Sequence, residues 1–266
     1  MQIHHVAFVS STPDIGLAEV AIVAAAIQKQ VVRDLAPLWD LAGTVSAFAR
    51  VEDVPKDDWL VLIGGDAGPA NGVHLDKDGV PYGVVEPGEH WSLVASHECL
   101  EMLVNPFGDR VLPGASVKAG QGQVEYLVEI CDPSQDPSHA YTIDGVLVSD
   151  FYTPAFLDAE ATVGGRYSFT GAITAPRQIL PGGYLSWRDP ATDHWWQDTF
   201  LRDPKPPPRD LGIVERARET ARAMIYRATP EPMHALPRPG QRAHAAAQAL
   251  RRAAGEPWRR APAGAR

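Results

Sequence analysis

Three features are scarce in this 266-residue chain, and each scarcity excludes a class of protein. No run of about 18 apolar residues occurs, so we expect no membrane-spanning helix. The two cysteines, Cys99 and Cys131, are too few for a disulfide-stapled scaffold. No basic segment precedes the apolar N-terminus, so we expect a cytoplasmic protein without a secretory signal. The sequence also has no Gly-x-Ser-x-Gly elbow, and no Lys-Ser/Thr follows Gly64-Gly65 as in a phosphate-binding loop.

Charge is distributed unevenly along the chain. Residues 205–266 contain 13 basic and 5 acidic residues, whereas residues 1–204 contain 11 basic and 28 acidic residues. The two parts therefore carry net charges of +8 and −17. An acidic body makes nucleic acid an unlikely main partner, while the basic tail can contact an acidic partner or fold back on the body.

The hydrophobic pattern predicts an α+β domain over residues 1–203. We expect a small mixed sheet beside two long helices. Residues 204–266 begin with a proline-rich linker and continue as a basic tail, helical at first and disordered beyond Thr229. The strands are expected at 3–9, 44–51, 59–63, 73–75, 80–85, 124–130, 141–148 (a hairpin), 167–173 and 184–187. The helices are expected at 15–41, 91–104 and 211–227.

Glycine and proline add detail to this pattern. Pro37 falls inside the first helical segment and is expected to kink or split it. Pro81 falls inside the strand 80–85, which favours an edge position for that strand. Asp144-Gly145 lies between two apolar runs and is typical of a hairpin turn.

A motif in the segment 91–104 carries the clearest sign of chemistry. It reads His-Glu-x-x-Glu from His97 to Glu101, inside an apolar segment. On a helix, His97 and Glu101 stand one turn apart on one face, where they can bind one divalent metal. Glu98, beside the first ligand, is placed to take a proton from a metal-held water as a general base. Cys99 points away from that face, which disfavours it as a nucleophile.

A metal bound by His97 and Glu101 needs at least one further protein ligand. Residues 128–133 offer two carboxylates, Glu129 and Asp132, where a strand gives way to a loop. Either can ligate the metal, and either can merely cap the turn ahead of Pro133. We expect zinc, although one histidine with two carboxylates also suits manganese, iron or calcium.

These two segments together resemble a pattern found in zincin-like metallopeptidases, including the Exordium or phosphate-induced proteins of plants and their bacterial relatives. The resemblance covers about residues 91–155 and implies a zincin-type fold. Cys131 precedes Asp132, whereas the family pattern has its cysteine after the aspartate, so no disulfide is carried over. The matching positions are Ser96, His97, Glu98, Glu101, Pro106, Glu129, Ile130 and Asp132, with Asn105 in place of the aspartate.

The residues favour a zinc-dependent hydrolase that acts on a peptide or protein. In this hypothesis Glu98 activates the water, and Tyr152 is a candidate donor to the oxyanion, although the sequence favours an aromatic that packs under a loop. An extended substrate is expected to pair with the edge at residues 80–85. The alternative is a non-catalytic binding or structural protein whose His-Glu-x-x-Glu cluster holds a structural metal or a hydrogen-bond network.

Overall fold

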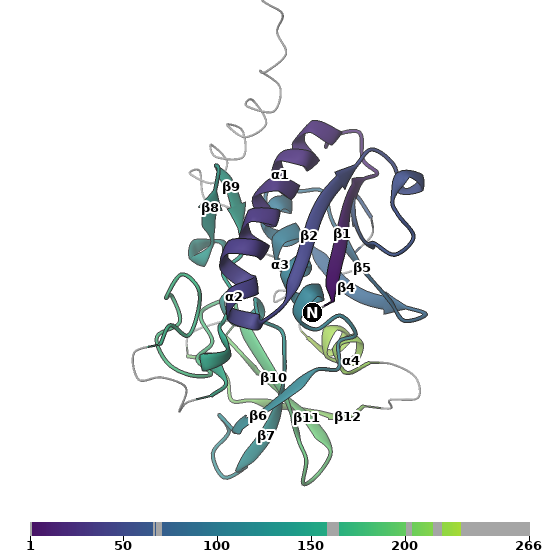
Figure 1. The fold of residues 1–266 in the computed structure, drawn as a ribbon. Helices are drawn as coiled ribbons and strands as arrows, with labels where there is room; N and C mark the ends of the chain where they lie inside the picture. The colour runs from purple at the N-terminus through teal and green to yellow at the C-terminus, as the bar shows by residue number, and fades with distance from the viewer. Residues whose placement is uncertain are drawn as a thin grey trace, which may run out of the picture.

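The computed structural model describes residues 2–65, 67, 71–158, 165–200, 204–214 and 220–229. The expected α+β class is confirmed: helices pack on a mixed sheet, and a second, antiparallel sheet lies below it (Figure 1). Within these residues no helix is both long and apolar enough to cross a bilayer. Residues 230–266, which include most of the expected tail, lie outside the described part.

The first sheet has the strand order β2-β1-β3-β5-β4. Its inner strands are parallel to one another, and only β4 runs antiparallel, at one edge. The expected strands are confirmed with shifts of a few residues at their ends. Their bounds are β1 (Ile3–Ser10), β2 (Ala42–Phe48), β3 (Trp59–Ile63), β4 (Gly72–Lys77) and β5 (Val80–Val85).

The edge position expected for residues 80–85 is wrong. Strand β5 lies between β3 and β4, and the edge strand is β4. Pro81 is tolerated there because pairing with β3 begins only at Tyr82, opposite Leu60. The missing N–H of Pro81 therefore removes no hydrogen bond from that parallel ladder.

The first long helix is continuous but contains a wider turn. Helix α1 (Leu17–Gln30) passes through a π-helical turn (Val31–Leu35) into α2 (Ala36–Trp39). Pro37 explains this turn, because its ring would clash with a carbonyl of the preceding turn in a regular α-helix. Helix α1 packs on β1 and β2, whereas α3 (Trp91–Val104) packs on β3, β4 and β5.

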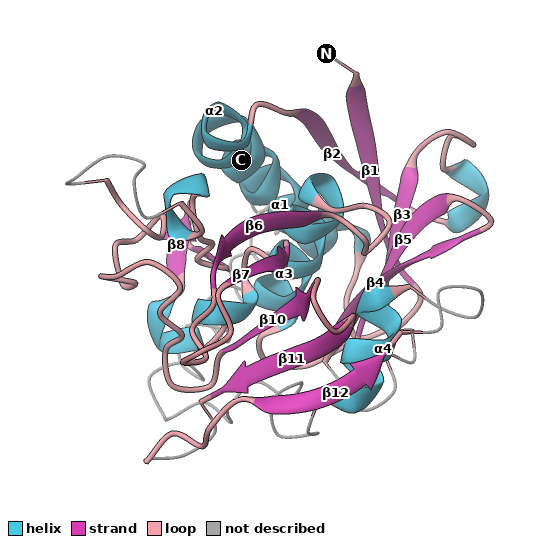
Figure 2. Cartoon of the chain, turned by 90° about the horizontal axis from the view of Figure 1, so that it is seen from below, coloured by secondary structure: helices cyan, strands magenta, loops and turns pink. Residues whose placement is uncertain are grey.

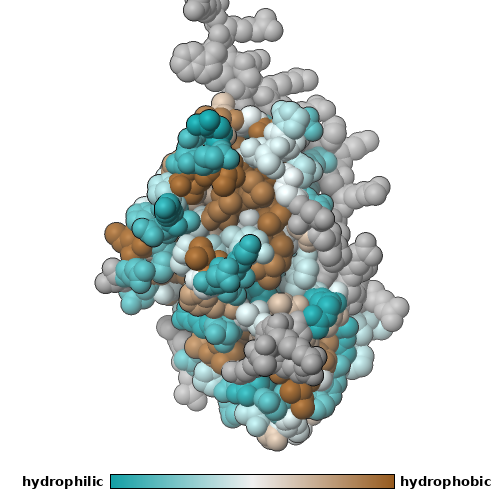
Figure 3. Space-filling view, turned by 90° about the vertical axis from the view of Figure 1, so that its right-hand side faces the viewer, coloured by the Kyte–Doolittle hydropathy of each residue, from teal (hydrophilic) through white to brown (hydrophobic). Residues whose placement is uncertain are grey.

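The two faces of this sheet differ in how deeply their side chains are buried. In β3 the residues alternate, with Trp59, Val61 and Ile63 buried and Leu60 and Leu62 half-buried. Figure 3 looks onto the side of the molecule where these strands lie and shows apolar surface among polar groups. The Ser96 hydroxyl of α3 donates a hydrogen bond to Gln30 of α1, so the two long helices lie side by side on one face of the sheet, and Trp59, Val61 and Ile63 belong to the core that they cover.

The second sheet is antiparallel, in the order β12-β11-β10-β7-β6. The helix expected over 211–227 is partly wrong, because residues 209–213 form β12, which pairs with β11; of the described residues in this range, those from Ala221 on are helical, in α4 (Ala221–Ala228). Gly212 has φ +82°, a conformation that disfavours a helix. The strands are β6 (Val111–Ala115), β7 (Gln123–Leu127), β10 (Tyr184–Asp189), β11 (His194–Thr199) and β12 (Arg209–Ile213).

Smaller elements complete the chain. The expected hairpin is confirmed as β8 (Tyr141–Ile143) and β9 (Val146–Val148), and both turn residues, Asp144 and Gly145, have positive φ. The strand expected at 167–173 is reduced to a single bridge between Tyr152 and Ser168. Short 3-10 turns occupy Val51–Asp53, Asp132–Ser134, Pro137–His139 and Pro154–Phe156.

Candidate metal centre

Helix α3 presents the His-Glu-x-x-Glu motif toward a cavity. The helix is buried along nearly its whole length, which its apolar sequence explains. It ends at Asn105, ahead of Pro106, and the Asn105 side chain accepts hydrogen bonds from the N–H groups of Asp109 and Arg110. The helix therefore ends at a fixed place one turn beyond Glu101.

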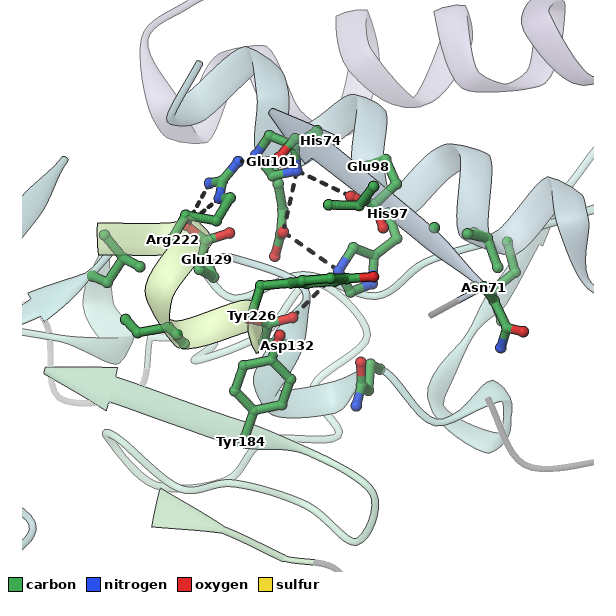
Figure 4. A pocket seen from close by; sticks show the side chains of 17 residues that line it. Asn71, His74, His97, Glu98, Glu101, Glu129, Asp132, Tyr184, Arg222 and Tyr226 are labelled. Atoms are coloured by element: carbon green, nitrogen blue, oxygen red, sulfur yellow. Dashed lines mark hydrogen bonds and ion pairs between the residues drawn. The ribbon is translucent and has the colours of Figure 1, made fainter. Parts of the chain in front are cut away.

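Three side chains converge at the bottom of this cavity (Figure 4). His97 Nε2 lies 3.4 Å from Glu101 Oε2 and 3.3 Å from Asp132 Oδ1. These separations exceed the usual N–H···O distance of about 2.9 Å. They equal the spacing of about 3.4 Å between ligand atoms that surround zinc tetrahedrally at about 2.1 Å. His97, Glu101 and Asp132 thus form a three-ligand group with the dimensions of a metal site.

Asp132 lies in this group because the chain turns four residues beyond the end of β7. The 3-10 turn Asp132–Ser134 brings the carboxylate under α3, and the Tyr184 hydroxyl donates a hydrogen bond to it. The other oxygen of Glu101 accepts a hydrogen bond of 2.9 Å from the N–H of Cys131. Both carboxylates are therefore held by partners outside the group.

Glu129 is not a member of this group. Its carboxylate is bonded to the guanidinium of Arg222 and to the amide of Asn105, which donates over 3.0 Å. An ion pair with a buried arginine leaves Glu129 Oε1 engaged away from the ligand atoms. Of the two carboxylates that the sequence left open, the geometry favours Asp132 as the third ligand.

His74 on β4 is the main site residue that sequence reasoning missed. It is 1% exposed, and its Nδ1 lies 3.0 Å from Glu98 Oε2 and 3.8 Å from Glu101 Oε2. Its side chain reaches α3 because β4 approaches the helix closely at Gly72, on the same strand face. A Cβ atom on Gly72 would lie 2.3 Å from Val94 Cγ1. A glycine two residues before His74, on the same face of the strand, was the sequence feature that could have indicated this close approach.

Burial and mutual charge set the protonation of the group. Burial opposes a charged His97, but Glu101 and the hydrogen bond to Asp132 outweigh it and raise the pKa of His97 well above its ordinary value. Burial raises the pKa of Glu98 to about 8 and that of Asp132 to about 7. Without a cation, the group therefore retains protons at neutral pH.

Tyr152 does not fit the role of an oxyanion donor. It is fully buried, stacks on Phe156 at 4.4 Å between ring centroids, and is absent from the cavity lining. It is the packing aromatic that the sequence left as the alternative. Tyr184 and Tyr226 are the tyrosines that line the cavity instead.

Comparison with models of protein families, with curated proteins and with solved structures finds no match to this chain. The function of the chain is therefore inferred from the geometry and chemistry of this cavity.

Proposed function

We propose that the chain is a zinc-dependent hydrolase of the zincin type that acts on peptides. The observation that carries the proposal is that Glu101 Oε2 and Asp132 Oδ1 lie 3.4 and 3.3 Å, respectively, from His97 Nε2. Support also comes from the mixed sheet with two long helices on one face, the arrangement that the resemblance implies.

The charge of the cavity fits a bound cation. Four carboxylates line it, against one guanidinium and two imidazoles. Buried carboxylates are costly unless they are paired or bind a metal, and a divalent ion would balance this excess. The donor set of one nitrogen and two oxygens is compatible with zinc, and manganese, iron and calcium remain the alternatives.

Glu98 is the residue proposed to move the proton. When bound, zinc supplies a Lewis acid that polarises a carbonyl and lowers the pKa of water. Glu98 takes one proton from the attacking water, and the water oxygen bonds to the carbonyl carbon. As the C–N bond breaks, Glu98 returns that proton to the departing amine, so the products are a carboxylic acid and an amine. The positive charge of the ion also favours the ionised, basic form of Glu98.

The edge strand β4 is the proposed place for an extended substrate. Asn71, Gly72, Val73 and His74 line the cavity, and β4 is the antiparallel edge of the sheet. Main-chain pairing with such an edge would hold a peptide across the ligand group. This role moves from residues 80–85, where the sequence placed it, to residues 71–74, which line the cavity.

The experiment that tests this function is Glu98→Gln, assayed on a peptide library beside the wild type. We expect hydrolysis to fall by about 10² or more, with zinc content unchanged. Glu52→Gln, on the exposed turn Val51–Asp53, is the matched control and should change neither property. Equal hydrolysis by Glu98→Gln and wild type would contradict the proposed role of Glu98. A Glu98→Gln protein that loses stability rather than activity would favour a structural cluster.

A further inference from the structure

Helix α4 comes from the basic C-terminal part of the chain, yet it forms one wall of the cavity. Arg222, Ile225 and Tyr226 line the cavity together with residues of α3 and β4. Figure 2 shows α4 beside β4, and its apolar residues pack against Leu127 and Trp195 of the second sheet.

Arg222 anchors this helix in the site. It is 6% exposed, and its guanidinium donates to Glu129, to the Asn105 carbonyl over 3.3 Å and to the His74 carbonyl over 3.4 Å. These partners belong to three different segments of the cavity wall. Arg222 therefore joins α4 to the end of α3, to the edge strand and to the segment after β7.

Helix α4 packs closely against the body of the protein. The Arg222 N–H donates to the Gly108 carbonyl over 3.2 Å, and a Cβ atom on Gly108 would lie 2.7 Å from Arg222 Cβ. Thr220 caps the start of the helix, and Thr229 at its end accepts a hydrogen bond of 2.7 Å from Gln197. Contacts in the first turn of α4 and at its end therefore fix the helix against the body of the protein.

Arg222 also occupies part of the free edge of β4. The Asn71 carbonyl accepts a hydrogen bond from Glu86 N–H, so Asn71 faces β5. Main-chain groups of an antiparallel strand alternate in direction, which turns those of Gly72 and His74 toward the free edge. The outward carbonyl of His74 is already bonded to Arg222. A peptide that pairs with this edge therefore meets α4 at His74.

Tyr226 extends this barrier across the cavity. Its hydroxyl donates over 2.6 Å to the carbonyl of Ala67, in the segment between β3 and β4. In Figure 4 its ring lies across the cavity in front of His97, with the hydroxyl directed toward the side of Asn71. Leu93 and Val94, which line the cavity one helical turn before His97, belong to α3 and not to α4.

We propose that α4 is a cover over the ligand group, anchored by Arg222 and closed by Tyr226, that restricts the site to short peptides and chain ends. The proposal rests on the proposed hydrolase function. A substrate that enters from the side of Leu93 and Val94 reaches the ligand group and stops at α4. A long peptide held at an internal bond needs room on both sides of the group, and α4 occupies one of them.

Two measurements on zinc-loaded full-length protein test this proposal. The first is the rate at which the chelator 4-(2-pyridylazo)resorcinol removes zinc, which needs no substrate. The second is the ratio of kcat/KM for one peptide bond in blocked tripeptides to that for the same bond at the centre of blocked decapeptides, with the products identified by mass spectrometry. Both are made on wild type, Tyr226→Phe and Tyr226→Ala. Arg227→Ala, an exposed position on the same helix, is the matched control.

We expect wild type and Arg227→Ala to prefer the tripeptides. In Tyr226→Ala, zinc release should rise roughly tenfold and the preference should fall, because the closing contact is lost; Tyr226→Phe should lie between. Equal cleavage of both lengths by wild type, or unchanged zinc release in Tyr226→Ala, would overturn the cover. Faster zinc release in Tyr226→Ala with no hydrolysis by any variant would support the cover and contradict the hydrolase function.

Discussion

His74 Nδ1 lies 3.0 Å from Glu98 Oε2, and both side chains are buried, so an imidazole from the edge strand holds the proposed general base. A partner of this kind fixes the direction of a reactive carboxylate and influences its basicity. The contact connects β4 to α3 at the centre of the cavity, and it gives the first prediction.

His74→Ala should lower hydrolysis by about 10- to 100-fold and leave the zinc content at the wild-type value. The reason is that Glu98 loses its orienting partner, whereas His97, Glu101 and Asp132 are retained. His74→Gln, which can still donate a hydrogen bond, should recover part of the rate. Steady-state kinetics and elemental analysis on the same samples measure both. Loss of zinc in His74→Ala would instead make His74 a ligand.

Gly72→Ala should destabilise the protein by about 1–3 kcal/mol, because the new methyl overlaps a packed core. Its Cβ would lie 2.3 Å from Val94 Cγ1 and 2.8 Å from Glu98 Oε1. Gly88→Ala is the matched control, since no atom lies within 4 Å of its Cβ position. Urea unfolding of both variants provides the comparison. Equal stability of the two would show that β4 does not pack this closely on α3.

Arg222→Met should cost about 3–5 kcal/mol of unfolding free energy, because it leaves Glu129 buried without its ion-pair partner. The double variant Arg222→Met/Glu129→Gln should lose less, since no uncompensated charge remains. A thermodynamic cycle with the Glu129→Gln single variant isolates the pair energy. Additive losses in the cycle would mean that the two groups do not interact.

Zinc affinity should rise with pH between about pH 6 and pH 8. In the metal-free protein, Glu101 and Asp132 outweigh burial and raise the pKa of His97, and burial raises the pKa of Asp132 to about 7. Both groups must lose protons to bind the metal, so acid weakens binding and zinc addition releases protons. Chelator competition across this range, and proton release at pH 7 in weak buffer, measure the effect. Affinity independent of pH would contradict this ligand assignment.

Local sequence signals predicted much of the fold. The apolar segment 91–104 predicted α3 with its observed bounds, and the continuous apolar run 59–63 predicted β3 with its own. Asp144-Gly145 predicted a hairpin whose turn residues both have positive φ. These elements depend on periodicity and turn chemistry, which are contained in a few neighbouring residues.

Features that depend on distant contacts were not predictable in the same way. Pro81 suggested an edge strand, but pairing with β3 begins after it, a register that residues 80–85 do not encode. The sequence did not distinguish Glu129 from Asp132 as a ligand. The bond between Glu129 and Arg222, which is 93 residues further along the chain, distinguishes them. The helix expected over 211–227 was wrong at its start, because residues 209–213 pair with β11 as strand β12. Each of these outcomes is decided by a partner far away in the sequence.

The most direct test of the central claim is elemental analysis of the purified protein after zinc loading and removal of free metal. The variants His97→Ala and Asp132→Ala are compared with Glu129→Gln, which removes a neighbouring carboxylate outside the ligand group. We predict about one zinc per chain in wild type and in Glu129→Gln, and none in the other two. A folded wild-type protein without zinc, or equal zinc in all four proteins, would contradict a metal centre built from His97, Glu101 and Asp132.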